Sequence, residues 1–535
     1  MLNGFLLSAS AIVMRSVSVS FNIYVSSKIG QSGMGLLTLI MSVYGFAVTV
    51  ATSGINLAVV RLVSGEMSYE SGDKIGKKTE QRVNKIMKDA LLYCLFFSSV
   101  ATLLLYFGAN TCASVFLDDK RAVSSLRLLS LTLIPISISS ALNGYFCAVR
   151  RIYKNVVAQF FEQGVKIFTV SSLLILLAPK SVELSCLFVS LGGVISETGS
   201  LLLSSFLYFF DRKLHRLPKG DFEKNRDVVS KKGFFIAKRE RLEVGKIASV
   251  AFPLALGSYA RSLLLTIEHL AIPWGLKRSG IDATGALSSY GILHGMVFPL
   301  LLFPTAVLGA FSSLLVPELS QAQEQNDTSR IKSIVSRVFY FSLLFSLGVS
   351  GIFICFSGEI GNALYASSEA GELIRILSPL IPLMYLDGAV DAMLKGLGEQ
   401  IYTMRVNIID SFMSILLILT LLPSMGIQGY ITAIFLTEIF NTSFSILRLM
   451  KVTKINPPVL KWVIKPLINI IAATLISRLV FNSRFFYSFL IKFINGEQLV
   501  FFEIGLCVLL YFVFARLSGT VSKTDIVLAK KLIKS

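Results

Sequence analysis

Long apolar runs recur along the chain, separated by short polar turns. A helix needs about 20 mostly apolar residues to cross about 30 Å of hydrocarbon, because each residue adds about 1.5 Å, and its backbone hydrogen bonds close internally. Runs of this kind cover residues 5–27, 35–62, 89–108, 122–147, 155–178, 183–210, 247–275, 286–315, 334–356, 372–394, 406–422, 428–447, 463–482 and 498–515. The pattern predicts an all-α polytopic membrane protein with about fourteen transmembrane helices.

The basic residues between these spans predict the orientation, since cytoplasmic loops carry the excess of lysine and arginine. With the N-terminus inside, the cytoplasmic segments hold 36 lysines and arginines and the opposite loops hold 8. A missed or an extra span would place every later loop on the wrong side of the membrane, and the excess of lysine and arginine would no longer fall on one side. We therefore predict an even number of spans and two cytoplasmic termini.

Composition excludes a soluble enzyme domain, because 54% of the residues are hydrophobic and only 16% are charged. The net charge of +19 and the basic segment 211–246 raise the question of nucleic-acid binding. Basic loops beside anionic lipid headgroups explain this charge, so we expect membrane lipids and no nucleic acid as partners. Six scattered cysteines and three histidines predict neither a disulfide framework nor a metal site, and no cofactor is expected.

Two six-helix blocks repeat at an offset of about 247 residues. The matched positions are Arg15 with Arg261, residues 42–45 with 288–291, Arg127 with Arg375, and Pro135 with Pro382. With six spans in each block, both copies enter the membrane from the same side, which predicts two parallel repeats around a central cavity. The predicted domains are an N-terminal six-helix bundle (1–210), a basic cytoplasmic linker (211–246), a second six-helix bundle (247–450), and an additional helix pair with a basic tail (451–535).

Several short motifs resemble those of the polysaccharide flippases. They are SKIGQSGMGL at 27–36, ATSG at 51–54, RLV at 61–63, LNGYF at 142–146, EQ at 162–163, LKGLG at 394–398, RVNIID at 405–410 and GIQG at 426–429. The chain is most similar to the stage V sporulation protein B group of the MOP superfamily, which also contains the lipid II flippase and the multidrug and toxin extruders. This resemblance implies a bacterial plasma-membrane protein that exports a lipid-linked saccharide, and we expect its transport unit to be a monomer.

Intramembrane arginines are the first candidate site. An ionisable group near the bilayer centre costs at least about 2.5 kcal/mol, so it usually faces a cavity or a partner. Arg15 and Arg261 occupy equivalent positions in the two blocks, and with Arg61 they are the candidate anion site, because guanidinium pairs bidentately with phosphate oxygens. The alternative is that each arginine ties helices together or extends to an interface.

Intramembrane acids are candidates for coupling to protons, sodium or the membrane potential. Glu268 lies seven residues after Arg261 and shares its helix face, so it is either a coupling group or a static partner of that arginine. Asp387 and Asp391 lie one turn apart and are followed by Lys395. The resemblance adds Asn407, Asp410 and Thr432, which match polar positions that bind sodium in some lipid II flippases, although the Asn–Asp spacing is three residues instead of four. We interpret Glu162 and Lys166 as a simple ion pair.

The main functional hypothesis is therefore alternating-access export of a polyprenyl-pyrophosphate-linked saccharide. A cation-coupled multidrug extruder of the same superfamily is the first alternative, and two central arginines oppose it. A membrane-embedded glycan-processing enzyme would need a catalytic constellation that the short outward loops lack. A scaffold for envelope or spore assembly is the remaining alternative, since fold does not fix function.

Overall fold

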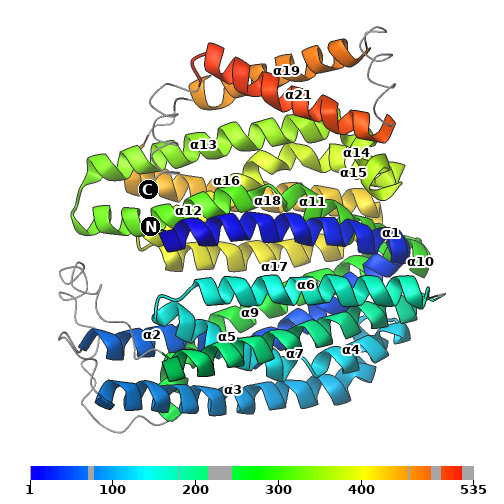
Figure 1. Cartoon of the computed structure of the whole chain (residues 1–535). Coiled ribbons are helices and arrows are strands. Elements are labelled where there is room, and N and C mark those ends of the chain that lie inside the picture. The colour runs from blue at the N-terminus through cyan, green and yellow to red at the C-terminus, as the bar shows by residue number, and fades with distance from the viewer. Residues whose placement is uncertain are drawn as a thin grey trace. The chain divides into compact units, whose positions relative to one another are not determined.

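The computed structural model describes residues 2–69, 77–179, 181–214, 244–455, 458, 460–482 and 496–520 (Figure 1). These residues form helices and contain no strand, which confirms the predicted all-α fold. Within them, ten helical segments are long and apolar enough to cross a membrane, or eleven if the bent pair α4–α5 forms one span. The first of these segments, Ser10–Met67, includes two of the predicted spans. The number fourteen stays a prediction, and most of the basic linker and the basic tail lie outside the described residues.

The chain divides into two compact units. Unit 2 comprises Leu36–Leu270 and unit 1 comprises Met1–Gly35 with Ala271–Ser535. Unit 2 contains α2 (Ile55–Tyr69), α3 (Lys77–Thr111), α4 (Val123–Ser130), α5 (Leu133–Ala148), α6 (Tyr153–Leu176), α7 (Val182–Leu214), the second part of α1 (Leu2–Thr52) and most of α9 (Val244–Arg278). A buried cluster that includes Val59, Met87 and Phe146 packs α2, α3 and α5 together.

Unit 1 contains the first part of α1 and the helices after α9. These are α10 (Ala283–Tyr290), the π-helical turn η4 (Gly291–Val297), α11 (Phe298–Leu302), α12 (Thr305–Glu324), α13 (Thr328–Cys355), α14 (Ser357–Tyr365), α15 (Ser368–Leu377), η5 (Ser378–Leu380), α16 (Ile381–Gly396), α17 (Gln400–Met425), α18 (Ile427–Thr453), η6 (Leu460–Ile464), α19 (Lys465–Asn482) and α21 (Gly496–Leu517). Its core joins α13, α16 and α18 through residues such as Val338, Val390 and Leu449.

The two units do not coincide with the two predicted six-helix blocks. Residues 1–35 group with the C-terminal helices, and residues 247–270 group with the N-terminal helices. One boundary follows Gly35, five residues after the helical path of α1 is broken at Gly30, and the other follows Leu270 inside α9. The predicted blocks follow the order of the helices along the chain. The packing contacts instead group residues 1–35 with the C-terminal helices and residues 247–270 with the N-terminal helices.

Helix boundaries nevertheless follow the predicted repeat. The α5 helix spans Leu133–Ala148 and α16 spans Ile381–Gly396, so both ends are offset by 248 residues. Each helix carries the matched proline, Pro135 or Pro382, near its start. The α4 helix ends three residues before α5 begins, and α15 ends four residues before α16, with η5 between them. Proline lacks an N–H donor and clashes with the carbonyl of the preceding turn, which explains why the helix breaks at these places. The angle between α4 and α5 is 44°.

Two departures from helical geometry interrupt the first apolar segment. Gly30 has φ 73° and ψ 179°, which ends the helical path of the first predicted span. Ser53 and Gly54 both have positive φ and separate α1 from α2. Glycine adopts this backbone conformation at little cost, whereas Ser53 is held there by the side-chain hydrogen bonds described below.

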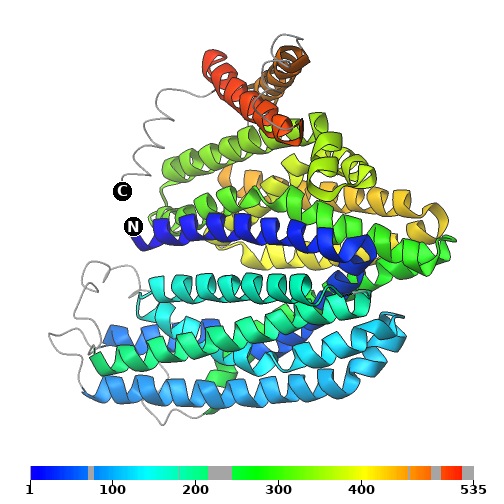
Figure 2. The ribbon, with the colours of Figure 1, turned by 45° about the vertical axis from the view of Figure 1, so that its right-hand side comes forward.

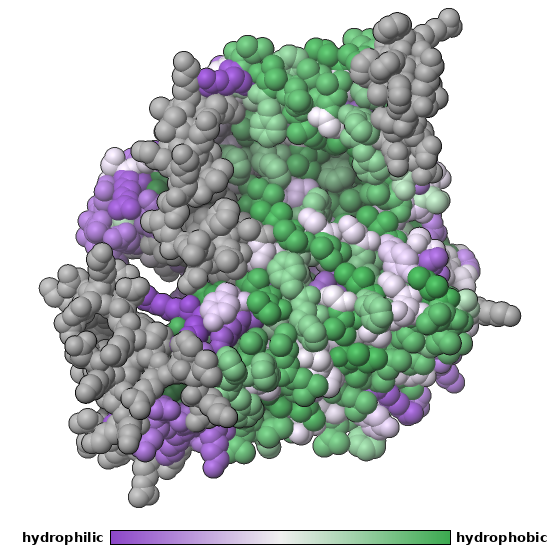
Figure 3. Space-filling view, viewed as in Figure 1, coloured by the Kyte–Doolittle hydropathy of each residue, from purple (hydrophilic) through white to green (hydrophobic). Residues whose placement is uncertain are grey.

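Apolar side chains dominate the outer surface of the helices. Phe107, Phe168, Leu176 and Leu479 are each at least 71% exposed. Figure 3 shows apolar side chains over most of the described surface in that view, with the most hydrophilic ones toward helix ends. Patches of this extent are rare on monomeric soluble proteins and match a surface covered by lipid.

Candidate functional site

In unit 2, hydroxyl groups attach α9 to the second part of α1. The Tyr259 hydroxyl lies 2.5 Å from Ser53 Oγ, and Ser53 Oγ also lies 2.8 Å from the Tyr93 hydroxyl of α3. Thr49 Oγ1 donates to Ser262 Oγ at 3.1 Å, and Thr266 Oγ1 donates to the carbonyl of Ser42 at 3.1 Å. The three α9 residues are spaced by three and four positions, so they form one face of the helix.

Arg261 and Glu268 lie outside this attachment face. Successive residues in a helix are about 100° apart, which places Arg261 about 100° from Ser262 and within about 20° of Glu268. The Arg261 side chain is exposed and Glu268 is half-buried. Among the described residues, no carboxylate lies within ion-pair distance of the Arg261 guanidinium. The described residues thus show no static ion pair between Arg261 and Glu268, and the role of Glu268 in coupling stays a prediction.

Arg15 and Arg61 are exposed as well. Arg15 lies in the part of α1 that belongs to unit 1, and Arg61 lies in α2 of unit 2. Neither guanidinium forms an ion pair with another described residue. Because guanidinium has five donors and no acceptor, all three arginines retain their capacity to bind an anion. Their common role as an anion site stays a prediction.

In unit 1, polar side chains from three adjacent helices come together. Asn407 Nδ2 of α17 donates to Asp391 Oδ2 of α16 at 3.3 Å, and Lys395 Nζ lies 3.9 Å from the same oxygen. Asn441 Nδ2 of α18 lies 3.4 Å from Asn407 Oδ1. Four of the predicted coupling residues, Asp387, Asp391, Asn407 and Asp410, thus belong to helices that pack against one another.

Glu438 on α18 was missed by the sequence prediction. It lies close enough to Asp387 and Asp410 for electrostatic repulsion, and its Oε1 accepts a hydrogen bond from Thr442 Oγ1 at 3.4 Å. Thr442 Oγ1 also lies 3.4 Å from the carbonyl of Leu383, which links α18 to α16. A signal was available in the sequence, because Glu438, Asn441 and Thr442 are spaced by three and four positions in an otherwise apolar helix.

We call Asp387, Asp391, Asp410 and Glu438, with Asn407 and Asn441, the acidic cluster. Asp391 Oδ1 and Asn441 Oδ1 are buried and have no hydrogen-bond partner among the described residues. The ammonium of Lys395 is half-exposed, and it is the cation that the structure places at ion-pair distance from this cluster within the described part of the chain. The cluster has four carboxyl groups, and Lys395 lies at ion-pair distance from Asp391 alone, so the carboxylates outnumber the ammonium, which favours uptake of protons or cations.

Thr432 does not join the acidic cluster. Its side chain is exposed, and its hydroxyl donates to the carbonyl of Gln428 one turn earlier at 2.9 Å. Thr432 and Glu438 are six positions apart and project from different faces of α18, and the part of Thr432 in ion coupling stays a prediction.

The predicted ion pair of Glu162 with Lys166 is also replaced by another contact. The Glu162 carboxyl lies close enough to the carboxyl of Glu197, from the adjacent helix α7, for the two to interact. Lys166 interacts electrostatically with Glu197 in the same group. The partner from α7 is 35 positions away in sequence, which local spacing rules do not detect.

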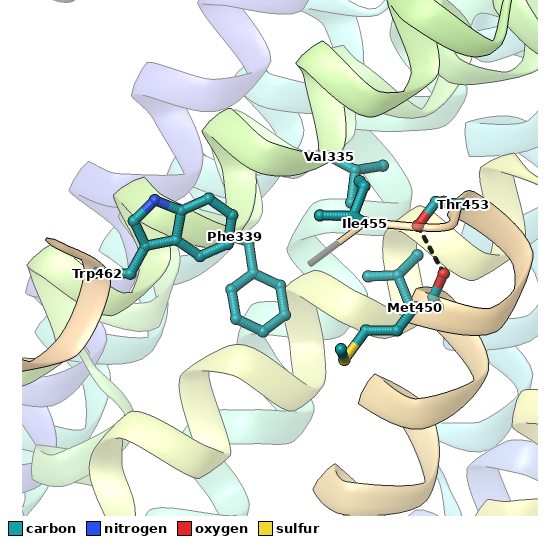
Figure 4. Close-up of a pocket in the computed structure, with 7 residues that line it drawn as sticks. Val335, Phe339, Met450, Thr453, Ile455 and Trp462 are labelled. Carbon is teal, nitrogen blue, oxygen red and sulfur yellow. Dashed lines mark hydrogen bonds between the residues drawn. The ribbon is translucent and has the colours of Figure 1, made fainter. Parts of the chain in front are cut away.

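A small pocket in unit 1 has no polar group to offer a saccharide or phosphate. It is lined by Val335, Phe339, Leu449, Met450, Thr453, Ile455 and Trp462 (Figure 4). Thr453 has the only side-chain hydroxyl in this lining, and it already donates to the carbonyl of Leu449 at 2.7 Å. The candidate site therefore consists of the arginines and the acidic cluster and not of this pocket.

Comparison with protein families gives the context for these residues. The family model described as polysaccharide biosynthesis protein matches residues 1–323, and the model described as MatE matches residues 279–420. The first match covers more than half of the chain. The chain belongs to the polysaccharide biosynthesis protein family. The predicted resemblance to flippases of the MOP superfamily is thereby confirmed.

Relatives of this polysaccharide biosynthesis family member include two curated proteins of Bacillus subtilis (strain 168). Stage V sporulation protein B is 25% identical over 433 residues, which cover 80% of this chain and 79% of that protein. Lipid II flippase MurJ is 23% identical over 452 residues, which cover 80% of this chain and 78% of the relative. A solved structure of lipid II flippase MurJ in an inward closed conformation aligns with a TM-score of 0.65 at 13% identity, over 96% of this chain and 98% of that one. This last likeness shows a common fold.

Proposed function

We propose that the chain moves a polyprenyl-pyrophosphate-linked saccharide from the inner to the outer leaflet of a bacterial plasma membrane by alternating access. The observation that carries this proposal is the family match over residues 1–323, together with relatives that include a lipid II flippase. The substrate class is a precursor of cell wall, spore cortex or polysaccharide. No covalent step is part of the proposal, so the protein acts as a transporter and not as an enzyme.

The arginines supply the anion site in this proposal. Arg15, Arg61 and Arg261 are exposed and have no carboxylate partner among the described residues, so no internal charge competes with a pyrophosphate. Each guanidinium can donate two parallel hydrogen bonds to phosphate oxygens, and charge-assisted bonds are about twice as strong as neutral ones. The polyprenyl tail stays in the surrounding lipid while the headgroup crosses.

The acidic cluster supplies the coupling site. Its carboxylates lie on α16, α17 and α18, and a proton or sodium ion bound there would relieve the repulsion among Asp387, Asp410 and Glu438. Such relief changes the packing of three helices in unit 1, which is how ion binding would bias one conformation over another. Glu268 remains a second candidate for coupling because it shares a face with Arg261.

A cation-coupled drug extruder is the second candidate function. The MatE match at residues 279–420 includes Asp387, Asp391 and Asp410 and therefore favours it. An extruder of organic cations is expected to use an acidic or aromatic binding cavity, whereas three unpaired arginines repel a cation. The charge of the transported substrate therefore distinguishes the two candidate functions, since the flippase carries an anion and the extruder carries a cation.

Reconstitution into lipid vesicles tests the proposal. Fluorescent polyprenyl-pyrophosphate disaccharide and an organic cation such as ethidium are offered to the same preparation. We expect movement of the anionic lipid alone. Arg261→Lys keeps the charge but loses the planar fork, so we expect partial transport, and Arg261→Gln should have almost none. Arg330→Gln is the matched control, because Arg330 is a surface arginine paired with Glu318 at 3.2 Å.

Ethidium transport without lipid transport would establish the extruder instead. Full lipid transport by the Arg15→Gln, Arg261→Gln double variant at equal membrane abundance would show that the two arginines do not bind the substrate.

A further inference from the structure

The C-terminal helix pair α19–α21 lies beside α13 (Figures 1 and 2). The Tyr511 hydroxyl of α21 donates to the carbonyl of Leu344 at 2.7 Å. A Cβ added to Gly348 would lie 2.7 Å from the Tyr511 ring, and one added to Gly351 would lie 2.4 Å from Ile470. Both glycines of α13 thus make room for side chains of the pair, which fixes its position against α13.

Arg478 of α19 extends this attachment to the next corner of unit 1. Its guanidinium lies 2.6 Å from Glu359 Oε1 of α14 and donates to the carbonyl of Cys355 at 2.6 Å. It also lies 3.7 Å from Glu503 Oε1 of α21 and 4.5 Å from the centre of the Phe356 ring. One arginine therefore contacts both helices of the pair and the turn between α13 and α14.

The α14–α15 hairpin behaves as one block. A Cβ added to Gly361 would lie 2.5 Å from Gly371 Cα, so the two helices touch through their backbones. Ser367, between the two helices, caps α15 by accepting the N–H of Ala370 at 3.2 Å. We therefore expect a shift of α14 at Glu359 to move Tyr365, at the other end of α14, and Ser367 in the turn that follows.

This hairpin in turn holds α1 and the π-helical turn η4. Gln31 Nε2 of α1 donates to Ser367 Oγ at 3.2 Å, and the Tyr365 hydroxyl donates to the carbonyl of Met296 in η4 at 2.9 Å. Within η4, His294 Nε2 lies 2.6 Å from the Tyr430 hydroxyl of α18. The contacts form a continuous path from α19 through α14 to the end of the first transmembrane helix.

We propose that the C-terminal helix pair is a brace that positions α1, and that Arg478 is its positioning residue. The pair was predicted from the sequence only as an addition to the two repeats. Arginine suits this place better than lysine, because one nitrogen of its planar fork reaches Glu359 and the Cys355 carbonyl while the other lies at ion-pair distance from Glu503. An effect of the brace on the transport rate rests on the proposed function. Its effect on the position of α1 relative to the α14–α15 hairpin does not.

The rate of disulfide formation between cysteines introduced by Gln31→Cys and Ser367→Cys reports how closely α1 is held against the α14–α15 hairpin. The rate is followed in membranes by mass spectrometry of the linked peptides, which distinguishes this pair from the six native cysteines. In the Arg478→Gln background we expect the rate to fall about tenfold, as for loss of one charge-assisted hydrogen bond, which corresponds to about 1.4 kcal/mol. Arg478→Lys should give an intermediate rate.

Arg448→Gln is the matched control. Arg448 also pairs with a carboxylate, Glu399 at 2.8 Å, and also stacks on an aromatic ring, Tyr402 at 5.0 Å, but it has no contact with α14. We expect it to leave the rate unchanged. Equal rates in the Arg478→Gln and wild-type backgrounds, or an equal fall in both glutamine variants, would overturn the brace. Lipid transport is measured in parallel, and its absence in the wild type would contradict the proposed function alone.

Discussion

Gly291→Ala tests how closely α1 packs against η4 in unit 1. A Cβ at this position would lie 2.2 Å from the carbonyl oxygen of Gln31 and 2.5 Å from the amide nitrogen of Gly35. Both are backbone atoms that no rotamer change can move. A carbon–oxygen contact needs more than about 3 Å, so α1 and η4 must separate by about 1 Å, and overpacking of this kind costs about 1–3 kcal/mol.

Gly388→Ala is the control for this variant, because nothing lies within 4 Å of its added Cβ. Alanine is favoured over glycine in a helix by about 1 kcal/mol, so Gly388→Ala should raise the thermal unfolding temperature slightly and Gly291→Ala should lower it. The assay is thermal unfolding in detergent at a fixed heating rate, with lipid transport measured alongside. If both variants shift the temperature in the same direction by the same amount, the close contact between α1 and η4 is not formed in the protein.

Four further outcomes are expected. A cytoplasmic reporter fused after Ser535 should be active and a periplasmic one inactive, and the reverse would refute the even number of spans. Glu438→Gln should slow turnover and alter its dependence on pH, sodium or potential, and unchanged dependence would make Glu438 structural. Thr432→Ala should transport at the wild-type rate, whereas a clear loss would return it to the site. Asp211→Asn should destabilise unit 2 by about 3–5 kcal/mol in thermal unfolding, because Asp211 is 6% exposed and accepts from Lys154 Nζ at 2.6 Å.

The sequence predicts the helices well because their length and hydropathy follow from the bilayer. Predicted spans at 155–178 and 406–422 correspond to α6 (Tyr153–Leu176) and α17 (Gln400–Met425). These features depend on residues that are neighbours in sequence, so periodicity and local chemistry are sufficient to find them. The predicted spans 122–147 and 372–394 run through the helix breaks before α5 and α16, although the matched prolines at 135 and 382 lie just after those breaks.

Features that depend on distant partners were not predictable in the same way. Glu438 meets Asp387 and Asp410 only after three helices have packed, and Glu197 meets Glu162 across two helices. The assignment of residues 1–35 to unit 1 depends on contacts such as that of Gln31 with Ser367. No periodicity in one helix encodes these contacts, which is why the acids were found singly and the unit boundaries were placed by chain order.

The grouping of the first helix with the last helices has a consequence for how the protein is made. Gln31 and Ser367 are 336 positions apart. At about 5–20 residues per second, the ribosome needs roughly 20–70 s to deliver the second residue after the first. During this interval α1 lacks its later partners from unit 1, and Arg15 costs at least about 2.5 kcal/mol if it lies near the bilayer centre, as the sequence predicts. The first helix must therefore stay in the membrane through this interval, until the α14–α15 hairpin that contacts it has been synthesised.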